Sequence, residues 1–345
     1  MPLPLFLIPL AIKGAAIAAG VVGVGSAIDG AVKMSDANDK MKEAQSRQEK
    51  NEAKMKSEEK QTTQQMDLLG KKELEIMSSF KEFSDVFERI QNRPNFATYS
   101  KNGFTLPKYD GNKFEEVSVG AEAILSGLGG GGVGTLGGIA AAGAAKVVVM
   151  SIGTASTGTA ISSLSGAAAT NATLALLGGG TLAAGGGGMA AGTAALGAAT
   201  LGVGLLVGGV IFSLSGSKIS GQADEAWNTM LDNEKKISKI CQYLTDLRGT
   251  ADTYYKAIQQ AESSYREHLR QMKSIVYGCG KTNWNYYTAG ERLLVENTVL
   301  LVQLLYDMCK VELVLKSSDK NGINTVNHQA VTNTVNKART VLGSI

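Results

Sequence analysis

A seven-residue repeat of mostly apolar side chains runs through the charged segment that follows residue 33. Its members are Met34, Met41, Gln48, Met55, Thr62, Leu69, Ile76, Phe83 and Ile90. Phe80 and Phe87 form a companion row, and the apolar surface is strong after Leu68 but thin before it. A repeat of this period is typical of helices that pack lengthwise against a partner. It predicts a coiled-coil-like arm over residues 31–93, which Pro94 ends because proline cannot continue a helix.

Helical spacing of apolar residues returns in the last third of the chain, residues 218–345. It predicts a long helix from Lys218 to Val276, a second from about Thr288 to Leu315 and a weaker third from about Asn324 to Leu342. Together with the arm, these helices are expected to form a long-helix bundle.

A short segment, residues 94–118, follows the arm and contains the turn pairs Asn102-Gly103 and Asp110-Gly111. Such pairs between alternating residues are typical of β-hairpins, although Pro107 restricts the middle of the segment to an edge strand. The pattern predicts one small β-hairpin here.

Residues 119–217 are rich in glycine and almost free of charge. Between Gly120 and Ser217 only Glu122 and Lys146 are charged, and 27 of the 42 glycines of the chain lie there. The chain averages of 19% charged residues and net charge +3 hide this division. Flexible linkers lack the leucine, valine and isoleucine that recur here, and collagen needs a three-residue period and abundant proline, whereas the whole chain has 5 prolines.

Small residues in this block recur at four-residue spacing, which places them on one helix face. The rows are Gly130, Gly134, Gly138 and Ala142; Gly180, Ala184, Gly188 and Gly192; and Gly204 with Gly208. Membrane helices approach one another closely through such faces. We therefore predict a glycine-zipper transmembrane block, with disorder or a buried soluble core as the alternatives. The expected fold class is all-α: Gly/Ala-rich membrane helices plus a cytoplasmic long-helix bundle, with the small β-hairpin.

A spanning helix needs about 20 apolar residues, and three stretches of the block approach this requirement. Ala194–Leu214 fits best, Val117–Ala145 carries Glu122 near its start, and Val147–Ala169 is diluted by serine and threonine. Because glycine, serine and threonine gain little from lipid, such helices are expected to pack against each other in a bundle or oligomer.

The apolar N-terminus, residues 1–30, predicts a separate membrane helix. Its apolar run contains Lys13, unlike a secretory signal, whose basic residues precede the run. Lysines are dense after Asp29, and others flank the glycine-rich block, so the positive-inside rule assigns both charged parts to the cytoplasm. The glycine-rich block is then expected to cross the membrane an even number of times.

Catalytic chemistry is scarce in this sequence. The stretch Gly278–Thr282, "GCGKT", resembles the end of a phosphate-binding loop, but Ile275 stands where that motif needs its first glycine. A turn of a helical hairpin explains it better. The histidines have no partner at metal-ligand spacing, and the 3 scattered cysteines suit a reducing compartment. We expect a protein that is not an enzyme and that uses no metal or cofactor.

One polar cluster is a candidate ligand site. Basic and aromatic residues lie close together in "KTNWNYYTAGER", and further basic residues line the preceding helix: Lys281, Trp284, Tyr286, Tyr287 and Arg292, with Arg266, Arg270 and Lys273. Single-stranded nucleic acids are bound in this way, with cations on phosphates and ring faces on bases. The alternative is structural, because aromatic residues at a bundle corner cap the core and helix cations are solvated.

The N-terminal "MPLPLFLIPLAIKGAAIAAGVVGVG", the Lys/Glu-rich arm, the glycine-zipper block and the C-terminal bundle together resemble bacterial glycine-zipper membrane proteins. Among these, the chain is similar to the HalA membrane effectors of Hailong anti-phage defence. The resemblance lies in architecture and composition over the whole chain, and no motif carries residues across. It implies an oligomeric inner-membrane effector, a tetramer, that arrests growth in abortive infection. It also implies that a partner nucleotidyltransferase makes single-stranded oligodeoxyadenylate, which holds the effector inactive.

From the residues alone, marginal membrane helices beside a long cytoplasmic bundle favour an ion channel or pore with a sensor. An α-helical pore-forming toxin is one alternative, since such toxins also place a hydrophobic hairpin between long helices. A membrane-anchored scaffold is another, in which the glycine-rich helices only hold a coiled-coil partner.

Overall fold

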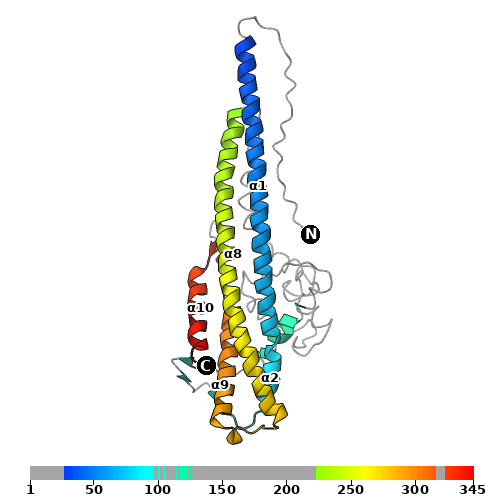
Figure 1. The fold of residues 1–345 in the computed structure, drawn as a ribbon, viewed down its shortest axis with the longest axis vertical. Coiled ribbons are helices and arrows are strands. Elements are labelled where there is room, and N and C mark those ends of the chain that lie inside the picture. The colour runs from blue at the N-terminus through cyan, green and yellow to red at the C-terminus, as the bar shows by residue number, and fades with distance from the viewer. Residues whose placement is uncertain are drawn as a thin grey trace, which may run out of the picture.

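The computed structural model describes residues 27–96, 100–101, 104–105, 114–115, 117–122, 125, 223–315 and 323–345. This part of the chain is mostly helical and forms an elongated rod (Figure 1). The glycine rows from Gly130 to Gly208 and residues 1–26 lie outside it. No helix among the described residues is long and apolar enough to cross a membrane.

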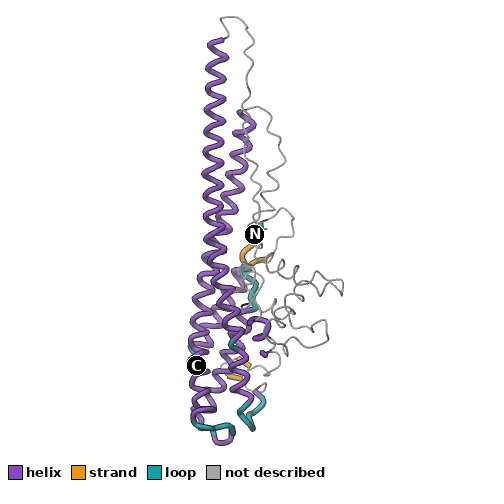
Figure 2. Tube along the Cα trace, turned by 90° about the vertical axis from the view of Figure 1, so that its right-hand side faces the viewer, coloured by secondary structure: helices purple, strands orange, loops and turns teal. Residues whose placement is uncertain are grey.

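Two long helices, α1 (Ala27–Ser78) and α8 (Ala223–Lys273), run side by side along the rod (Figures 1 and 2). They are parallel, because partners on α8 advance with the residue number on α1. The contacts that show this are Arg47 with Glu234, Thr62 with Leu244, and Lys72 with Glu262. We call the end at which both helices begin the proximal end and the opposite one the distal end.

Two further helices thicken the distal half of the rod. After α8, a π-helical turn η4 (Ser274–Gly278) and a 3-10 turn η5 (Trp284–Tyr286) reverse the chain. Helix α9 (Ala289–Cys309) then returns along α8, and α10 (His328–Leu342) packs on α8 and α9. The capping box of Thr288 and Glu291 fixes the start of α9.

The structure ends the second predicted helix earlier than Leu315. Helix α9 stops at Cys309, and β3 (Val314–Leu315) pairs antiparallel with β4 (Thr325–Val326). The carbonyl of buried Leu313 accepts a hydrogen bond from the Asn327 amide, so tertiary pairing overrides helix propensity here. The predicted small hairpin is confirmed: β1 (Ser100–Lys101) pairs antiparallel with β2 (Phe104–Thr105) on either side of Asn102-Gly103.

The seven-residue repeat correctly identifies the packed face of the arm. Six of its members are buried, each at most 1% exposed, as are both companion phenylalanines: Met55, Thr62, Leu69, Ile76, Phe83, Ile90, Phe80 and Phe87. Aromatic rings dominate the distal core, where Phe80 contacts Tyr265 and Tyr306. The rod is therefore packed most densely in its distal half.

The arm is not one continuous helix that Pro94 ends. It breaks at Ser79, and α2 (Phe80–Glu88) continues it to a stop six residues before the proline. Beyond α2 the backbone turns at Asn92, which has a positive φ of 56°. The Gln91 amide then bonds to the Thr282 carbonyl, which ties the end of the arm to the distal turn.

The candidate span Val117–Ala145 is wrong at its start. Val117, Ser118 and Ala121 are buried in the distal core beside α2, and Phe114 packs edge-on against Phe80. We call residues 114–115 and 117–122 the insertion segment. Its buried side chains belong to the bundle, because their apolar faces are used against α1, α2 and α9.

Adjacent leucines on α1 provide a test of this packing. Leu69 is fully buried, whereas Leu68 is 53% exposed. We expect Leu69→Ala to lower the free energy of unfolding by about 2–5 kcal/mol because it leaves a cavity in the core. Leu68→Ala, the matched control, should change it by less than about 1 kcal/mol. Urea unfolding followed by far-UV circular dichroism measures both, and equal losses would contradict the described seam.

Candidate functional site

The predicted ligand cluster lies at the distal end of the rod, and the structure brings its Lys281–Arg292 part together. Trp284 and Tyr287 are buried, 6% and 4% exposed. The Trp284 ring packs against Tyr287 and, edge-on, against Phe96. The Tyr287 hydroxyl donates to the Lys281 carbonyl. These two rings therefore cap the core, and stacking of a base on Trp284 needs a conformation other than this one.

Most of the cluster's cations have carboxylate partners. The pairs are Lys281 with Glu291 at 2.6 Å, Arg270 with Glu267 at 2.6 Å, Lys273 with Glu82 at 2.5 Å and Arg266 with Glu262 at 3.2 Å. The Arg270 and Gln271 hydrogen bonds lower the pKa of Glu267 to about 2. Arg292 instead lies over the Trp284 ring and donates to the Trp284 and Asn285 carbonyls.

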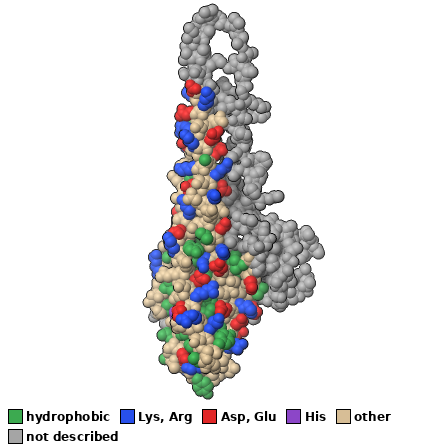
Figure 3. All heavy atoms as spheres, turned by 45° about the vertical axis from the view of Figure 1, so that its right-hand side comes forward, with side chains coloured by type: hydrophobic (Ala, Val, Ile, Leu, Met, Phe, Trp, Pro, Cys, Tyr) green, Lys and Arg blue, Asp and Glu red, His purple; other side chains and the backbone are tan. Residues whose placement is uncertain are grey.

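Acidic side chains beside the basic ones also weaken the case for a polyanion site on α8. A shallow pocket there is bordered by Arg266 and Arg270 but equally by Glu262 and Glu267. On the face shown in Figure 3, basic and acidic side chains alternate along the rod. In the cluster itself, Tyr286 is the aromatic side chain that remains open, with 77% exposure. A stacked ligand would have to use that ring.

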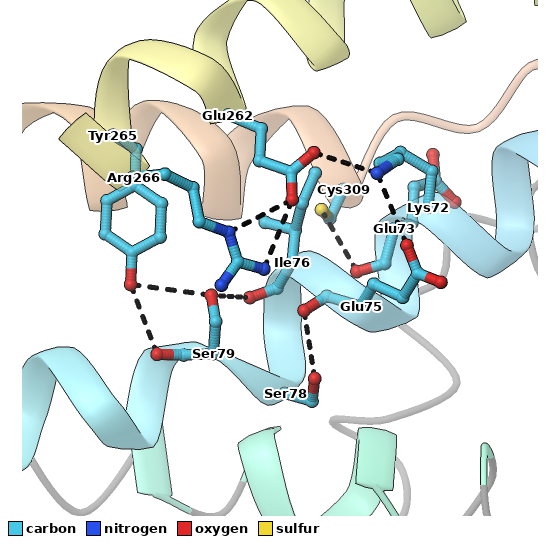
Figure 4. A network of polar contacts seen from close by, with 10 residues as sticks. All are labelled: Lys72, Glu73, Glu75, Ile76, Ser78, Ser79, Glu262, Tyr265, Arg266 and Cys309. Atoms are coloured by element: carbon cyan, nitrogen blue, oxygen red, sulfur yellow. Dashed lines mark hydrogen bonds and ion pairs between the residues drawn. The ribbon is translucent and has the colours of Figure 1, made fainter. Parts of the chain in front are cut away.

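A second polar region, which the sequence analysis did not identify, lies in the core around the break between α1 and α2 (Figure 4). Lys72 bonds to Glu262 on α8 at 3.0 Å and to Glu75 at 3.3 Å, and Arg266 approaches Glu262 from the other side. Burial lowers the pKa of Lys72, but its bonds to Glu262 and Glu75 outweigh this and raise it. This ion-pair group joins α1 to α8 just before the break.

Hydroxyl groups satisfy the backbone at the break. The Tyr265 hydroxyl donates to the Ser79 carbonyl at 3.1 Å, and the Ser79 hydroxyl donates to the Ile76 carbonyl at 2.6 Å. The Ser118 hydroxyl donates to the Met77 carbonyl and accepts from the Lys81 amide, both at 2.8 Å. Every one of these contacts is at least partly buried, so they replace water as partners of the broken helix.

Glu73 is the exception in this region. Its side chain is 0% exposed, and neither carboxylate oxygen has a hydrogen-bond partner. Burial raises the pKa of Glu73 well above its usual range, because the charged form is disfavoured away from water. Burial likewise raises the pKa of the neighbouring Cys309 thiol, which donates to the Glu73 carbonyl. A buried polar group without a partner is costly.

One signal could have identified Glu73 from the sequence. It lies seven residues before Phe80, on the companion row, where an apolar side chain is expected. Ser79 and Ser118 carried no such signal, because both are ordinary residues in their local sequence.

The described residues contain no group of side chains arranged to hold a metal ion. Cys241 and Cys309 are buried free thiols, and Cys279 is exposed at the distal turn. The segment before "GCGKT" is helical, so the strand of a phosphate-binding loop is absent from that position. Comparison with protein-family models, with curated proteins and with solved structures finds no match.

Glu73→Gln tests whether the buried carboxyl is neutral. The folded protein keeps a proton on Glu73 that the unfolded chain releases above about pH 4.3. Stability should therefore fall as pH rises from that value toward the raised folded-state pKa, with a slope of up to about 1.4 kcal/mol per pH unit. We expect Glu73→Gln to remove this slope and to raise Tm at pH 8 more than at pH 5. Thermal unfolding of both proteins measures it, and identical pH profiles would show that Glu73 is ionised.

Proposed function

We propose that this protein is an oligomeric membrane effector or channel whose helical rod lies in the cytoplasm and controls the membrane-embedded part. In line with the resemblance to the Hailong membrane effectors, the protein would disrupt the inner membrane of a bacterium and arrest growth during phage infection. An assembly of four copies would surround a pore with the marginal, glycine-rich helices.

The parallel course of α1 and α8 carries this proposal. The apolar residues 1–26 directly precede α1, and the charge-free stretch that ends at Ser217 precedes α8. Because the helices are parallel, residues 1–26 and the C-terminal end of the charge-free stretch both join the rod at its proximal end, whereas the N-terminal end of the glycine-rich block leaves the rod in its distal half, at residues 117–122. In an antiparallel pair, the two junctions would instead lie apart by the length of α8, about 75 Å. One bilayer at the proximal end can therefore accommodate both segments.

The gradient of packing along the rod supports a transmitting role. The distal half holds the aromatic core, whereas the proximal half is joined by a thinner seam that includes Ala44, Met55 and Met230. Asn51 in this half has a buried amide nitrogen without a hydrogen-bond partner. A coil with few buried side chains, placed between an aromatic core and a membrane, can change its geometry at low cost.

The two alternatives differ from the proposal in measurable ways. A secreted pore-forming toxin would remain soluble before insertion and expose the rod outside the cell. A scaffold would be membrane-bound but would not make the bilayer permeable.

The exposed thiol of Cys279 tests location, because Cys241 and Cys309 are buried. We expect the chain in the membrane fraction to resist carbonate extraction and Cys279 to react with a membrane-impermeant maleimide only after the cells are permeabilised. Cys279→Ser is the control for reaction at other sites. Labelling in intact cells, or recovery in the soluble fraction, would exclude a cytoplasmic rod on a membrane anchor.

Depolarisation of the membrane on expression separates a channel from a scaffold. Gly188→Leu should reduce this depolarisation, because the larger side chain separates packed helices.

The inhibitory ligand is a separate part of the proposal: a short single-stranded oligodeoxyadenylate bound to the distal cluster. Its support is the exposed ring of Tyr286, which follows Asn285, whose carbonyl accepts a hydrogen bond from Arg292. Binding would favour a closed membrane part only through a higher affinity for that state.

We expect Tyr286→Ala to weaken oligodeoxyadenylate binding by roughly 5- to 150-fold, since stacking contributes about 1–3 kcal/mol per base. Tyr286→Phe keeps the ring and should bind as the parent does. The phosphate contribution should fall steeply between two salt concentrations. Trp284→Ala is a poor probe because the residue is in the core. If the intact protein binds no oligonucleotide, the DNA part is wrong and the membrane part is unaffected.

A further inference from the structure

The break between α1 and α2 is occupied by a hydroxyl group from elsewhere in the chain. Ser118 Oγ donates to the Met77 carbonyl and accepts from the Lys81 amide. These two backbone groups are four residues apart, so they are the partners of a regular α-helical hydrogen bond. The Ser118 side chain is 1% exposed. One serine hydroxyl therefore stands in the place of one helical hydrogen bond.

The local sequence does not require this break. Residues 76–83 contain neither glycine nor proline, and the seven-residue row continues through the break in phase, from Ile76 to Phe83. Ser79 has φ −80° and ψ −10°, within the right-handed helical region. Insertion of a side chain into the hydrogen-bond ladder is a known cause of sharp kinks. The sequence of α1 and α2 thus permits one helix, in which the Ser78 and Ser79 hydroxyls bond back to the Glu75 and Ile76 carbonyls and Ser118 separates Met77 from Lys81.

The insertion segment holds Ser118 in place through contacts on both sides of it. The Phe114 ring lies 5.5 Å from Phe80 and 5.9 Å from Tyr306, centroid to centroid. Val117 and Ala121 are fully buried. At the surface, Lys81 Nζ lies 3.3 Å from Glu115 Oε1. This segment leads directly into the glycine-rich block, which begins at Gly120.

We propose that the insertion segment is a conformational latch on the arm. While Ser118 is inserted, α1 and α2 are two helices and the Tyr265 hydroxyl bonds to the Ser79 carbonyl. When Ser118 leaves, the Met77 carbonyl and the Lys81 amide pair with each other, and residues 27–88 form one continuous helix.

The latch has two discrete states. In one, the Lys81 amide donates directly to the Met77 carbonyl; in the other, the Ser118 hydroxyl bridges these two groups. Either state satisfies both backbone groups, so the exchange leaves neither of them unpaired in the core. That the latch couples the rod to the membrane rests on the proposed function; the existence of the two helix states does not.

The test measures the direction of α2 in the full-length protein by electron spin resonance distances. Spin labels are placed at Glu88→Cys on α2 and Gln260→Cys on α8, both exposed, in a Cys279→Ser background. The remaining cysteines are buried and unreactive. Since α2 is nine residues long, about 13 Å, a change in its direction moves its end by several ångströms.

We expect Ser118→Ala to shift this distance by about 3 Å or more, because the helix can close its own hydrogen bond. Ser79→Ala is the matched control. It removes a buried hydroxyl at the same break that bonds only to α1 and Tyr265, and it should leave the distance unchanged. Glu115→Lys repels Lys81 without touching the core and should shift part of the population the same way.

A distance in Ser118→Ala equal to that in the parent and in Ser79→Ala overturns the latch. If Ser118→Ala does not fold, an unchanged distance in Glu115→Lys overturns it. Membrane leakage by the unlabelled parent is scored separately. A distance shift without any leakage supports the latch and contradicts the channel, whereas leakage without a shift contradicts the latch alone.

Discussion

The parallel packing of α1 on α8 is the interaction on which the rest of the structure depends. Helices this long and this highly charged depend on a packed face for stability, and each provides one for the other. The seam sets the register of the ion pairs from Arg47–Glu234 at one end to Lys273–Glu82 at the other. It also directs both preceding apolar segments to one end and leaves the distal half for α9, α10 and the insertion segment. The proposed arrangement on a membrane follows from that single direction.

Polar groups buried in the distal core mostly have hydrogen-bond or ion-pair partners. Glu262 is buried but has both Lys72 and Arg266, and Tyr265 is buried but donates to Ser79. Glu73 has no such partner although it lies in the same region. Burying an unpaired carboxyl costs free energy that an apolar residue would not. The junction of α1, α8 and α9 is therefore a place where this fold is not optimised for stability alone, and it adjoins the break at which Ser118 is inserted.

The basic and aromatic cluster shows why composition is a weak guide to a binding site. Lys281, Trp284 and Tyr287 have the right chemistry for a nucleic acid, but the fold uses the rings as core and the cation as an ion pair. The partners could not be read from the local sequence. Glu82, which pairs with Lys273, lies 191 residues away, and Phe96 packs on Trp284 from beyond the end of α2. Exposure is a tertiary property, and it leaves Tyr286 as the open ring of the cluster.

The sequence by itself determined the helices, the buried face of the arm, the Asn102-Gly103 hairpin and the separation of charge from the glycine-rich block. Periodicity and turn chemistry are local, so they report which side chains face a neighbour. They do not report which neighbour, or in which direction it runs. Only the tertiary structure decided that α1 and α8 are parallel, that α9 gives way to a strand, and that the arm breaks at Ser79. The break at Ser79 involves Ser118, which lies about 40 residues further along the chain. Its hydroxyl bonds to the Met77 carbonyl and the Lys81 amide, which would otherwise bond to each other within the helix.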